Sequence, residues 1–480
     1  MSDTSARRQA PRFYPWLIAI TGMLALFLSN GMTATGITIF DPSLLDAFGW
    51  SRGDLKFRDA LTFWTTACIS PFAGILIDRV NPKYLLMGGF TLLTLGYFGY
   101  SMLANGGPVL LLEIIAGLTV LALSGVLALA LREMLPKLPA WLAPLIGVLA
   151  AGVALWLYSQ AWMGSALKQT WMIHLMFSLA LSTCGSMVVI FLVSSWFVRH
   201  RGLAIGISLV GTSLGSALLP TFDPYLIRAV GWREAFVYNA FMPIAVFLLV
   251  LLFVKGTPRH AGTVALGQNE KVADLKRQGM LFAQAIRTRT FWAICLSGFL
   301  TYYAIFGFVQ NFVLHLNKGF GYPLGDAGKL LGLFSVVAMA AKLFNGALAD
   351  RIDRHKVFIC CLGIMLLGVI GIASMKREWV VASAVIIGLG WGGLFTLYNM
   401  LAVNNFGLRE IGRINGAISF FESIGVGFGS WLTGRLFDVY GSYQVAFSVI
   451  AFAVFLAMLI GTQIRSEVDD DGQPLHATAH

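Results

Sequence analysis

Long apolar runs constrain the fold of this chain more than any other feature. Fourteen stretches of about 20 residues carry few charges, and a helix of that length crosses a hydrocarbon core of ~30 Å. Of the 480 residues, 57% are hydrophobic and only 12% are charged, which excludes a soluble protein. Because unpaired backbone groups cannot face lipid, the runs must be helices. The runs are residues 15–39, 57–78, 84–104, 108–131, 139–159, 171–195, 202–222, 233–254, 290–314, 327–349, 355–374, 379–403, 412–436 and 443–464.

The distribution of basic residues predicts how the helices are oriented. With the N-terminus in the cytosol, the 34 Lys and Arg favour cytosolic joints over external ones by about two to one, as the positive-inside rule requires. We therefore expect an integral, multi-pass protein of the plasma (cell inner) membrane with both termini in the cytosol. The net charge of +11 is then explained by the surface of the lipid bilayer, and we expect no nucleic-acid partner. The first run is too long for a cleavable signal, so we expect it to stay as the first helix.

Motifs that would indicate an ATP-driven pump or a redox site are not found in the sequence. No ATP-binding P-loop string or Cys-x-x-Cys spacing occurs. The sequence predicts no enzyme activity, no cofactor and no metal. Five cysteines lie within predicted helices, where they are expected to be small apolar fillers: Cys68, Cys184, Cys295, Cys360 and Cys361.

A Gly-x-x-x-Asp-Arg turn occurs once in each half of the chain, each time at the end of an apolar run. The glycine permits close helix approach, and the aspartate can cap a helix and pair with arginine at the cytosolic surface. Two copies in matching context indicate a duplicated transporter with a cytosolic gate. The residues are Gly74, Asp78 and Arg79, then Gly346, Asp350 and Arg351.

The repeat also predicts the domain organisation. The polar stretch 255–289 reads as a cytosolic linker between an N-terminal bundle, 14–254, and a C-terminal bundle, 290–465. Gly74 and Gly346 are 272 residues apart, but the matching Gly206 and Gly416 are only 210 apart, so the first half holds 62 additional residues. They coincide with two surplus apolar runs, and we expect an inserted helix hairpin at about 105–167. The fold class is therefore an all-α membrane protein of two pseudo-symmetric six-helix bundles plus an inserted pair, about 14 transmembrane helices. The hairpin is a candidate surface for a homodimer or another partner.

Three further strings carry a family resemblance. They are Phe48-Gly-Trp-Ser-Arg52, Trp196-Phe-x-x-x-Arg-Gly-Leu-Ala-x-Gly206 and Gly388-x-Gly-x-Gly-Gly-x-Phe395. With the paired turns, the chain resembles the major facilitator superfamily, and within it the monocarboxylate transporter and oxalate–formate exchanger branch. The inserted pair departs from the family's twelve-helix pattern. The resemblance implies two rocking bundles, a central substrate site and alternating access.

Lys342 and Glu422 are the two strong candidates for charges at mid-bilayer. Lys342 lies eight residues from Asp350 and Glu422 nine from Arg413, which places them ~12 Å and ~13.5 Å along their helices, near the middle of the core. The resemblance implies that Lys342 stands where relatives carry an Arg that holds a substrate carboxylate. It also implies that Glu422 replaces a second cationic group of the exchanger, and that Ala338 replaces an aspartate of proton-coupled relatives.

These two residues suggest a mechanism. We hypothesise that Lys342 attracts a carboxylate and that Glu422 pairs with Lys342 while the site is empty. Glu422 would take up a proton when substrate displaces it, because a low dielectric favours the neutral carboxyl group. The alternative is a permanent structural salt bridge between the two helices.

Other polar and aromatic residues are weaker candidates for the substrate site, and each has a structural alternative. Asn30 and Thr33 could orient a ligand or make ordinary hydrogen bonds between helices. Arg58 could attract anions at the external side or form an interfacial pair with Asp59, its side chain snorkelling to the membrane surface. Tyr302 and Trp391 could line the cavity or pack as aromatic contacts.

The sequence favours a secondary active transporter of a small organic anion, with a monocarboxylate and proton symport as the leading form. Carboxylate exchange without protons and drug-type efflux remain open alternatives. A non-transporting membrane sensor is the alternative from a different class.

Overall fold

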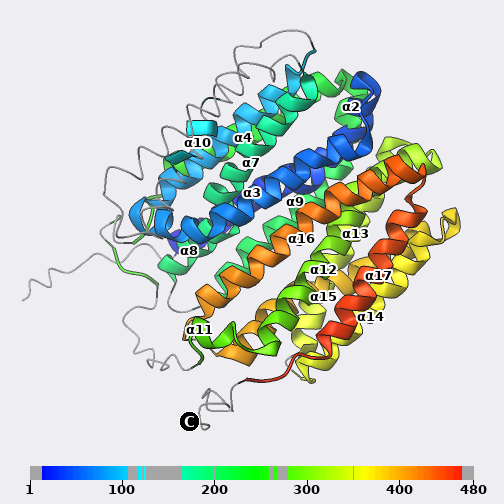
Figure 1. The fold of residues 1–480 in the computed structure, drawn as a ribbon. Coiled ribbons are helices and arrows are strands. Elements are labelled where there is room, and N and C mark those ends of the chain that lie inside the picture. Colours follow the sequence, from blue (N-terminus) through cyan, green and yellow to red (C-terminus); the bar gives the residue numbers. More distant parts are fainter. Residues whose placement is uncertain are drawn as a thin grey trace, which may run out of the picture. The chain divides into compact units, whose positions relative to one another are not determined.

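The computed structural model describes most of the chain as helices (Figure 1). It describes residues 13–105, 117, 119–121, 124–125, 165–197, 200–258, 261, 263–266, 279–349, 351–407 and 409–467. At 71–76, 78 and 79 it describes only the helical backbone. Within these ranges there are no strands, only isolated bridges between Phe197 and Leu266 and between Gly279 and Gly407. The all-α prediction is confirmed for the described residues.

Twelve of the fourteen predicted runs fall on helices in the described part of the chain. Nine helices or joined helical segments there are long and apolar enough to cross a membrane. Three more helices, α3 (Arg52–Arg79), α4 (Pro82–Ser101) and α16 (Ile411–Tyr440), have 28, 20 and 30 residues, which is also enough to span. The runs 108–131 and 139–159 lie almost wholly outside the described residues. The inserted pair and the total of fourteen helices therefore stay predictions.

The first of two compact units comprises residues 1–37, 68–215 and 225–272. Besides α4, its helices are α1 (Tyr14–Asn30), the π-helical turn η1 (Gly31–Thr35), α7 (Ala166–Cys184), α8 (Ser186–Trp196), α9 (Arg201–Val230, in part) and α10 (Trp232–Phe253). α4 packs between α7 and α10, and α1 packs on α8. Gly211 and Gly215 bring α9 against the backbone of α1, where a β-carbon at either position would meet Met23 O or Phe27 O. Close packing through glycine therefore holds this unit together.

The second unit comprises residues 38–67, 216–224 and 273–480. Its helices are α2 (Asp41–Phe48), the first part of α3, α11 (Phe282–Ala285), α12 (Arg289–Leu314), the π-helical turn η3 (His315–Gly319), α13 (Leu324–Ala349), α14 (Arg354–Ala373), α15 (Val380–Phe406), α16 and α17 (Tyr443–Gly461). α12 packs along α16 and α17, and α15 packs along α13 and α14. The predicted bundles 14–254 and 290–465 differ from these units in residues 38–67 and 216–224, which lie in the second unit. Much of the predicted linker 255–289 lies outside the described residues.

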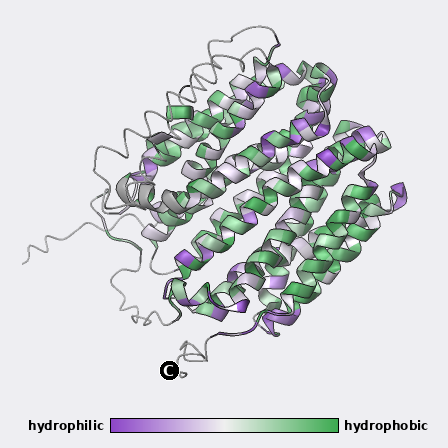
Figure 2. Cartoon of the chain, in the orientation of Figure 1, coloured by the Kyte–Doolittle hydropathy of each residue, from purple (hydrophilic) through white to green (hydrophobic). Residues whose placement is uncertain are grey.

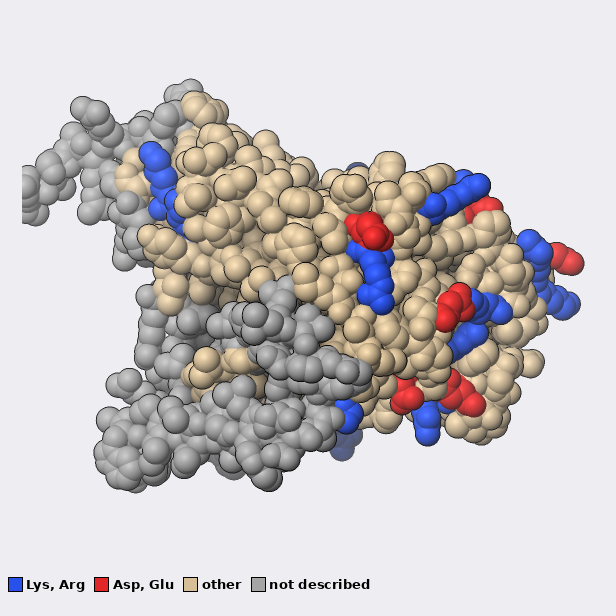
Figure 3. Space-filling view, turned by 90° about the horizontal axis from the view of Figure 1, so that it is seen from above, with Lys and Arg blue, Asp and Glu red and all other residues tan. Residues whose placement is uncertain are grey.

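The exposed surface of the helices is largely apolar, as contact with lipid requires. Hydrophobic residues run along the helices and hydrophilic residues gather near their ends (Figure 2). On the face shown in Figure 3, Lys, Arg, Asp and Glu form small groups on an otherwise uncharged described surface. Large apolar side chains are openly exposed, among them Leu252, Leu343, Phe344 and Leu367. Such exposure would cause aggregation in water but is expected in a bilayer.

Candidate functional site

Lys342 lies on α13, where the packing of α13 against α15 brings it to an aromatic ring. Its side chain is partly buried, and its ammonium group lies 4.3 Å from the centroid of the Phe395 ring. That distance allows an attractive cation–π interaction, which is stronger in a desolvated setting. Gly392, one turn before Phe395, makes this approach possible, because a β-carbon there would meet the Ala338 carbonyl of α13.

Glu422 lies on α16, against a glycine of α12. A β-carbon at Gly298 would lie 3.4 Å from Glu422 Cγ and 3.7 Å from its Oε1. The missing side chain at Gly298 therefore leaves room for the carboxyl group. Tyr302 of α12 and Tyr398 of α15 lie in the neighbourhood of this carboxyl group. Glu422 is therefore placed among the packed helices α12, α15 and α16.

Aromatic rings connect the surroundings of these two charges. The Tyr302 and Trp391 ring centroids are 5.1 Å apart in an edge-to-face arrangement, and the Trp391 and Phe395 centroids are 6.1 Å apart. The rings therefore run from Tyr302, beside Glu422, to Phe395, beside Lys342. Four predicted site residues, Lys342, Glu422, Tyr302 and Trp391, thus lie on packed helices of the second unit, and their role as one site stays a prediction. A direct ion pair between Lys342 and Glu422 stays a prediction.

Asn30 and Thr33 lie in the first unit, at the point where α1 becomes the π-helical turn η1. The Thr33 hydroxyl donates to the Ser29 carbonyl oxygen, and Asn30 Nδ2 lies 3.4 Å from Ser29 Oγ. These bonds are local ones. The π-helical turn was not expected from the sequence, and such irregular turns often occur at functional sites. A ligand role for the two residues stays a prediction.

Arg58 belongs to a buried cluster of four charged side chains. Arg58 and Lys56 both bind Asp41, and Arg58 Nε and Lys56 Nζ lie 3.4 Å and 3.3 Å from the carboxylate of Asp59. All four side chains are at most 1% exposed. The expectation of an interfacial pair with a snorkelling arginine is wrong, because Arg58 and Asp59 pair inside the protein.

The same cluster contains two buried charges that were not candidates in the sequence. Asp41 and Lys56 are both fully buried. Sequence reasoning placed both residues in the polar joint between two spans. The joint instead folds as the short helix α2, which turns Asp41 toward the start of α3. The available signal was the pair Asp41 and Lys56 in this joint, followed directly by Arg58 and Asp59 at the start of the next run, since buried charges are paired.

The start of α3, which carries Lys56, Arg58 and Asp59 of this buried cluster, is held against α16. Asp438 accepts hydrogen bonds from the backbone N–H groups of Arg52 (2.9 Å) and Gly53 (2.7 Å) at the start of α3. The Arg52 guanidinium carbon lies 3.5 Å from the centroid of the Phe437 ring. Farther along α3, Trp64 Nε1 donates to Ile424 O at 3.2 Å. An anionic carboxylate at a helix N-terminus also stabilises the helix dipole.

The predicted gate motifs fall largely outside what the structure describes. The side chains of Gly74, Asp78 and Arg79, and all of Asp350, lie outside the described residues, although residues 74, 78 and 79 have helical backbone in α3. Gly346 lies in α13. A β-carbon added there would lie 3.9 Å from the Thr396 side chain, which is an ordinary van der Waals distance. Arg351 is exposed in the turn that follows. The gate stays a prediction.

The described residues contain no group of three or more His, Cys, Asp or Glu side chains that could hold a metal ion. The fold and the clusters above are those of an integral, multi-pass helical membrane protein. The family profile described as "Major Facilitator Superfamily" matches residues 139–430 and 294–473. The chain belongs to this superfamily.

Individual relatives are distant. An MFS-type transporter of Gibberella moniliformis is 24% identical over 266 residues, 54% of this chain and 60% of that protein. The hexuronate transporter of Escherichia coli strain K12 is 23% identical over 59% of this chain and 72% of that protein. The glycerol-3-phosphate transporter of Bacillus subtilis strain 168 is 22% identical over 57% of this chain and 66% of that protein. The chain thus spans about three fifths of the Gibberella relative.

Solved structures agree with the fold over nearly the whole chain. A D-xylose–proton symporter superposes with a TM-score of 0.65 at 15% identity, covering 94% of this chain and 98% of the symporter. A bacterial homologue of the human lysosomal transporter Spinster, inward-facing and unoccupied, gives a TM-score of 0.60 at 14% identity, covering 95% of this chain and 99% of that one. At these identities the likeness extends to the fold alone.

Proposed function

We propose that this protein is a secondary active transporter of a small organic anion, a monocarboxylate, working by alternating access with proton symport. We place it in the plasma (cell inner) membrane with both termini in the cytosol. The observation that carries the proposal is the partly buried Lys342 ammonium group beside Phe395, inside the apolar helix α13 and seven residues before its end. A lysine inside a membrane helix costs up to about 2.5–3.5 kcal/mol, so its presence there indicates a function.

The names of two relatives support an anionic substrate. One is called a hexuronate transporter and the other a glycerol-3-phosphate transporter. A hexuronate is a sugar acid with a single carboxylate group, which matches the single ammonium group offered by Lys342. The fold neighbour named as a D-xylose–proton symporter supports the idea of proton coupling.

Glu422 is the proposed proton carrier. Its carboxyl group lies beside Gly298 of α12, and a carboxyl group in a setting of low dielectric can take up a proton from water. The rings of Tyr302, Trp391 and Phe395 would form the wall that contacts the apolar part of the substrate. A carboxylate bound at Lys342 would leave Glu422 to be neutralised by a proton.

The proposal is tested with the full chain purified and reconstituted in liposomes. Radiolabelled acetate, lactate, pyruvate and glucuronate are offered singly, and uptake is compared with that of empty liposomes. Lys342→Ala is expected to lower uptake of the accepted acid at least ~10-fold, as expected when about 1.4 kcal/mol of binding is lost. Lys329→Ala is the matched control, because Lys329 is an exposed lysine of the same helix.

Equal uptake by Lys342→Ala and the wild type would contradict the assignment of Lys342. Two other outcomes identify the alternatives. Uptake that requires unlabelled acid inside the liposomes and ignores the pH gradient would indicate anion exchange. Binding of the acid without any flux would indicate a sensor.

The aromatic rings favour a second candidate, efflux of an amphipathic organic compound. Phe63 of α3 contacts Phe306 at a centroid distance of 5.4 Å, and Phe306 stacks on Tyr302 at 6.4 Å, which extends the ring system. Cells that express the protein and exclude an amphipathic dye, with no uptake of any acid, would support efflux over the leading proposal.

A further inference from the structure

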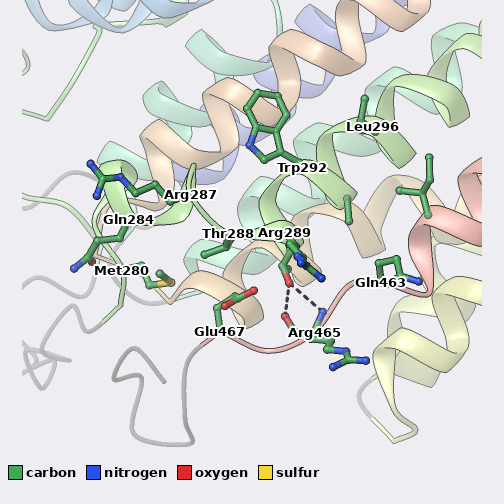
Figure 4. A pocket seen from close by; sticks show the side chains of 13 residues that line it. Met280, Gln284, Arg287, Thr288, Arg289, Trp292, Leu296, Gln463, Arg465 and Glu467 are labelled. Atoms are coloured by element: carbon green, nitrogen blue, oxygen red, sulfur yellow. Dashed lines mark hydrogen bonds between the residues drawn. The ribbon is translucent and has the colours of Figure 1, made fainter. Parts of the chain in front are cut away.

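A pocket of about 900 Å³ lies in the second unit, and neither Lys342 nor Glu422 lines it. It is formed by α11, the start of α12, the end of α17 and the segment after α17 (Figure 4). Its size falls in the range of ~300–1,000 Å³ that is usual for small-molecule sites. The lining residues are Met280, Gln284, Arg287, Thr288, Arg289, Thr290, Trp292, Ala293, Leu296, Ile460, Gln463, Arg465 and Glu467.

One side of this pocket is cationic. Arg287, Arg289 and Arg465 line it with exposed side chains, against a single carboxylate, Glu467, which is only 8% exposed. Thr290 fixes the segment after α17 to α12, because its hydroxyl donates to Arg465 O (3.1 Å) and accepts from Arg465 N–H (3.2 Å). The arginines therefore come from two parts of the chain that are joined by the hydrogen bonds of Thr290.

The other side is apolar and lies farther along α12. Trp292 and Leu296 are 46% and 45% exposed, and Figure 4 shows them on the opposite side of the pocket from Arg465 and Glu467. Trp292 Nε1 donates to Ile286 O at 2.9 Å, which holds the indole at the start of the helix. Leu296 lies seven residues after Arg289, ~10 Å farther along the helix axis. Tryptophan at such a boundary is typical of the membrane–water interface.

We propose that this pocket binds an anionic phospholipid, with its headgroup attracted by the three lining arginines and its acyl chains along Trp292 and Leu296. Arginine is suited to this role because its planar guanidinium group binds phosphate oxygens in pairs. Basic pockets between membrane helices are known to accept such headgroups. A free phosphate ion would fill only a fraction of the volume and would not use the apolar side. The polar-to-apolar gradient along α12 therefore favours a lipid.

The test measures binding of fluorescent phosphatidylglycerol to the full-length protein in neutral detergent, by fluorescence anisotropy, with fluorescent phosphatidylcholine as the comparison. We expect phosphatidylglycerol to bind at least ~10-fold more tightly. The variant R287Q/R289Q/R465Q is expected to lose this preference, since each arginine near an anionic headgroup contributes about a 5-fold effect. The matched control is K356Q/R377Q/R409Q, which removes three exposed cations of the same unit that do not line the pocket.

A second arm distinguishes lipid from soluble phosphoester. Glycerol 3-phosphate at millimolar concentration is expected to leave the bound lipid in place, and equal competition by it would overturn the proposal. The three single variants guard against misfolding, because exposed substitutions usually change stability little. Each should weaken binding and still elute as a monodisperse protein. Unchanged binding by all single variants and by the triple variant would also overturn the proposal.

Discussion

At the scale of single residues, two kinds of cation lie in the apolar helices of this protein. Arg58 and Lys56 are fully buried and held by the carboxylates of Asp41 and Asp59. Lys342 is only partly buried and lies over the ring of Phe395. The first arrangement is that of a structural network, whereas the second belongs to the residue that we propose as the substrate-binding cation. Substitutions should therefore separate stability from transport.

Asp41→Asn should destabilise the protein strongly. Removing one carboxylate leaves Arg58 and Lys56 with too little compensating charge, which costs about 3–5 kcal/mol at a buried site. Asp46→Asn is the control, since Asp46 is 67% exposed in an ion pair with Lys318 and should lose less than about 1 kcal/mol. Thermal unfolding in detergent measures both, and equal midpoints would show that the buried cluster does not stabilise the fold.

Glu422→Gln should uncouple transport from protons. Because glutamine cannot take up a proton, uptake driven by a pH gradient should fall at least ~10-fold, while exchange of labelled for unlabelled acid continues. Glu378→Gln removes an exposed carboxylate and should behave as the wild type. If the Glu422 variant keeps a full response to the pH gradient, the carboxyl group is not the proton carrier.

At the scale of elements, glycines determine how closely the helices of the second unit approach. A β-carbon at Gly425 or Gly429 of α16 would collide with Phe299 O or Tyr303 O of α12. The same two helices carry Glu422 and Tyr302. Their packing therefore places the proposed proton carrier beside its phenol, and a wider separation would displace both.

Gly425→Ala and Gly429→Ala should each lower stability by about 1–3 kcal/mol, the usual effect of overpacking. Gly416→Ala, on the same helix, meets nothing within 4 Å and should be neutral or slightly stabilising, because alanine favours helix more than glycine does. Unfolding midpoints in one detergent compare the three. If Gly416→Ala lowers the unfolding midpoint as much as Gly429→Ala does, close packing at Gly425 and Gly429 does not explain the loss of stability.

The helices were predictable from the sequence, but the corner around Asp41 was not. Apolar runs of spanning length were sufficient to place the described long helices, and the glycine pattern indicated close packing. The burial of Asp41 and Lys56 was not predicted, because both residues lie in the joint between two apolar runs. They become buried only because this joint folds as the helix α2. The length of an apolar run indicates which residues enter the membrane. Whether the segment between two runs is buried depends on tertiary packing.

At the scale of the whole molecule, the sequence predicted the superfamily, whereas the substrate site around Lys342 and Glu422 stays a prediction. Lys342 and Glu422 stood out because charges are rare in spans, and their depths followed from helix rise. The aromatic rings that join their surroundings belong to α12 and α15, and nothing in the spacing along one helix reveals which neighbour it will contact. The lipid pocket was not predictable either, since its arginines meet only when the segment after α17 folds back onto α12.

The central claim is most directly tested by proton-driven accumulation of a labelled monocarboxylate in liposomes that contain the purified protein. With the outside acidic, the account predicts accumulation above the equilibrium level set by the empty liposomes, together with proton entry reported by a pH dye inside. A protonophore should abolish the accumulation, and Lys342→Ala should not show it at all. Accumulation no greater than in empty liposomes for every acid offered, or undiminished accumulation by Lys342→Ala, would contradict the account.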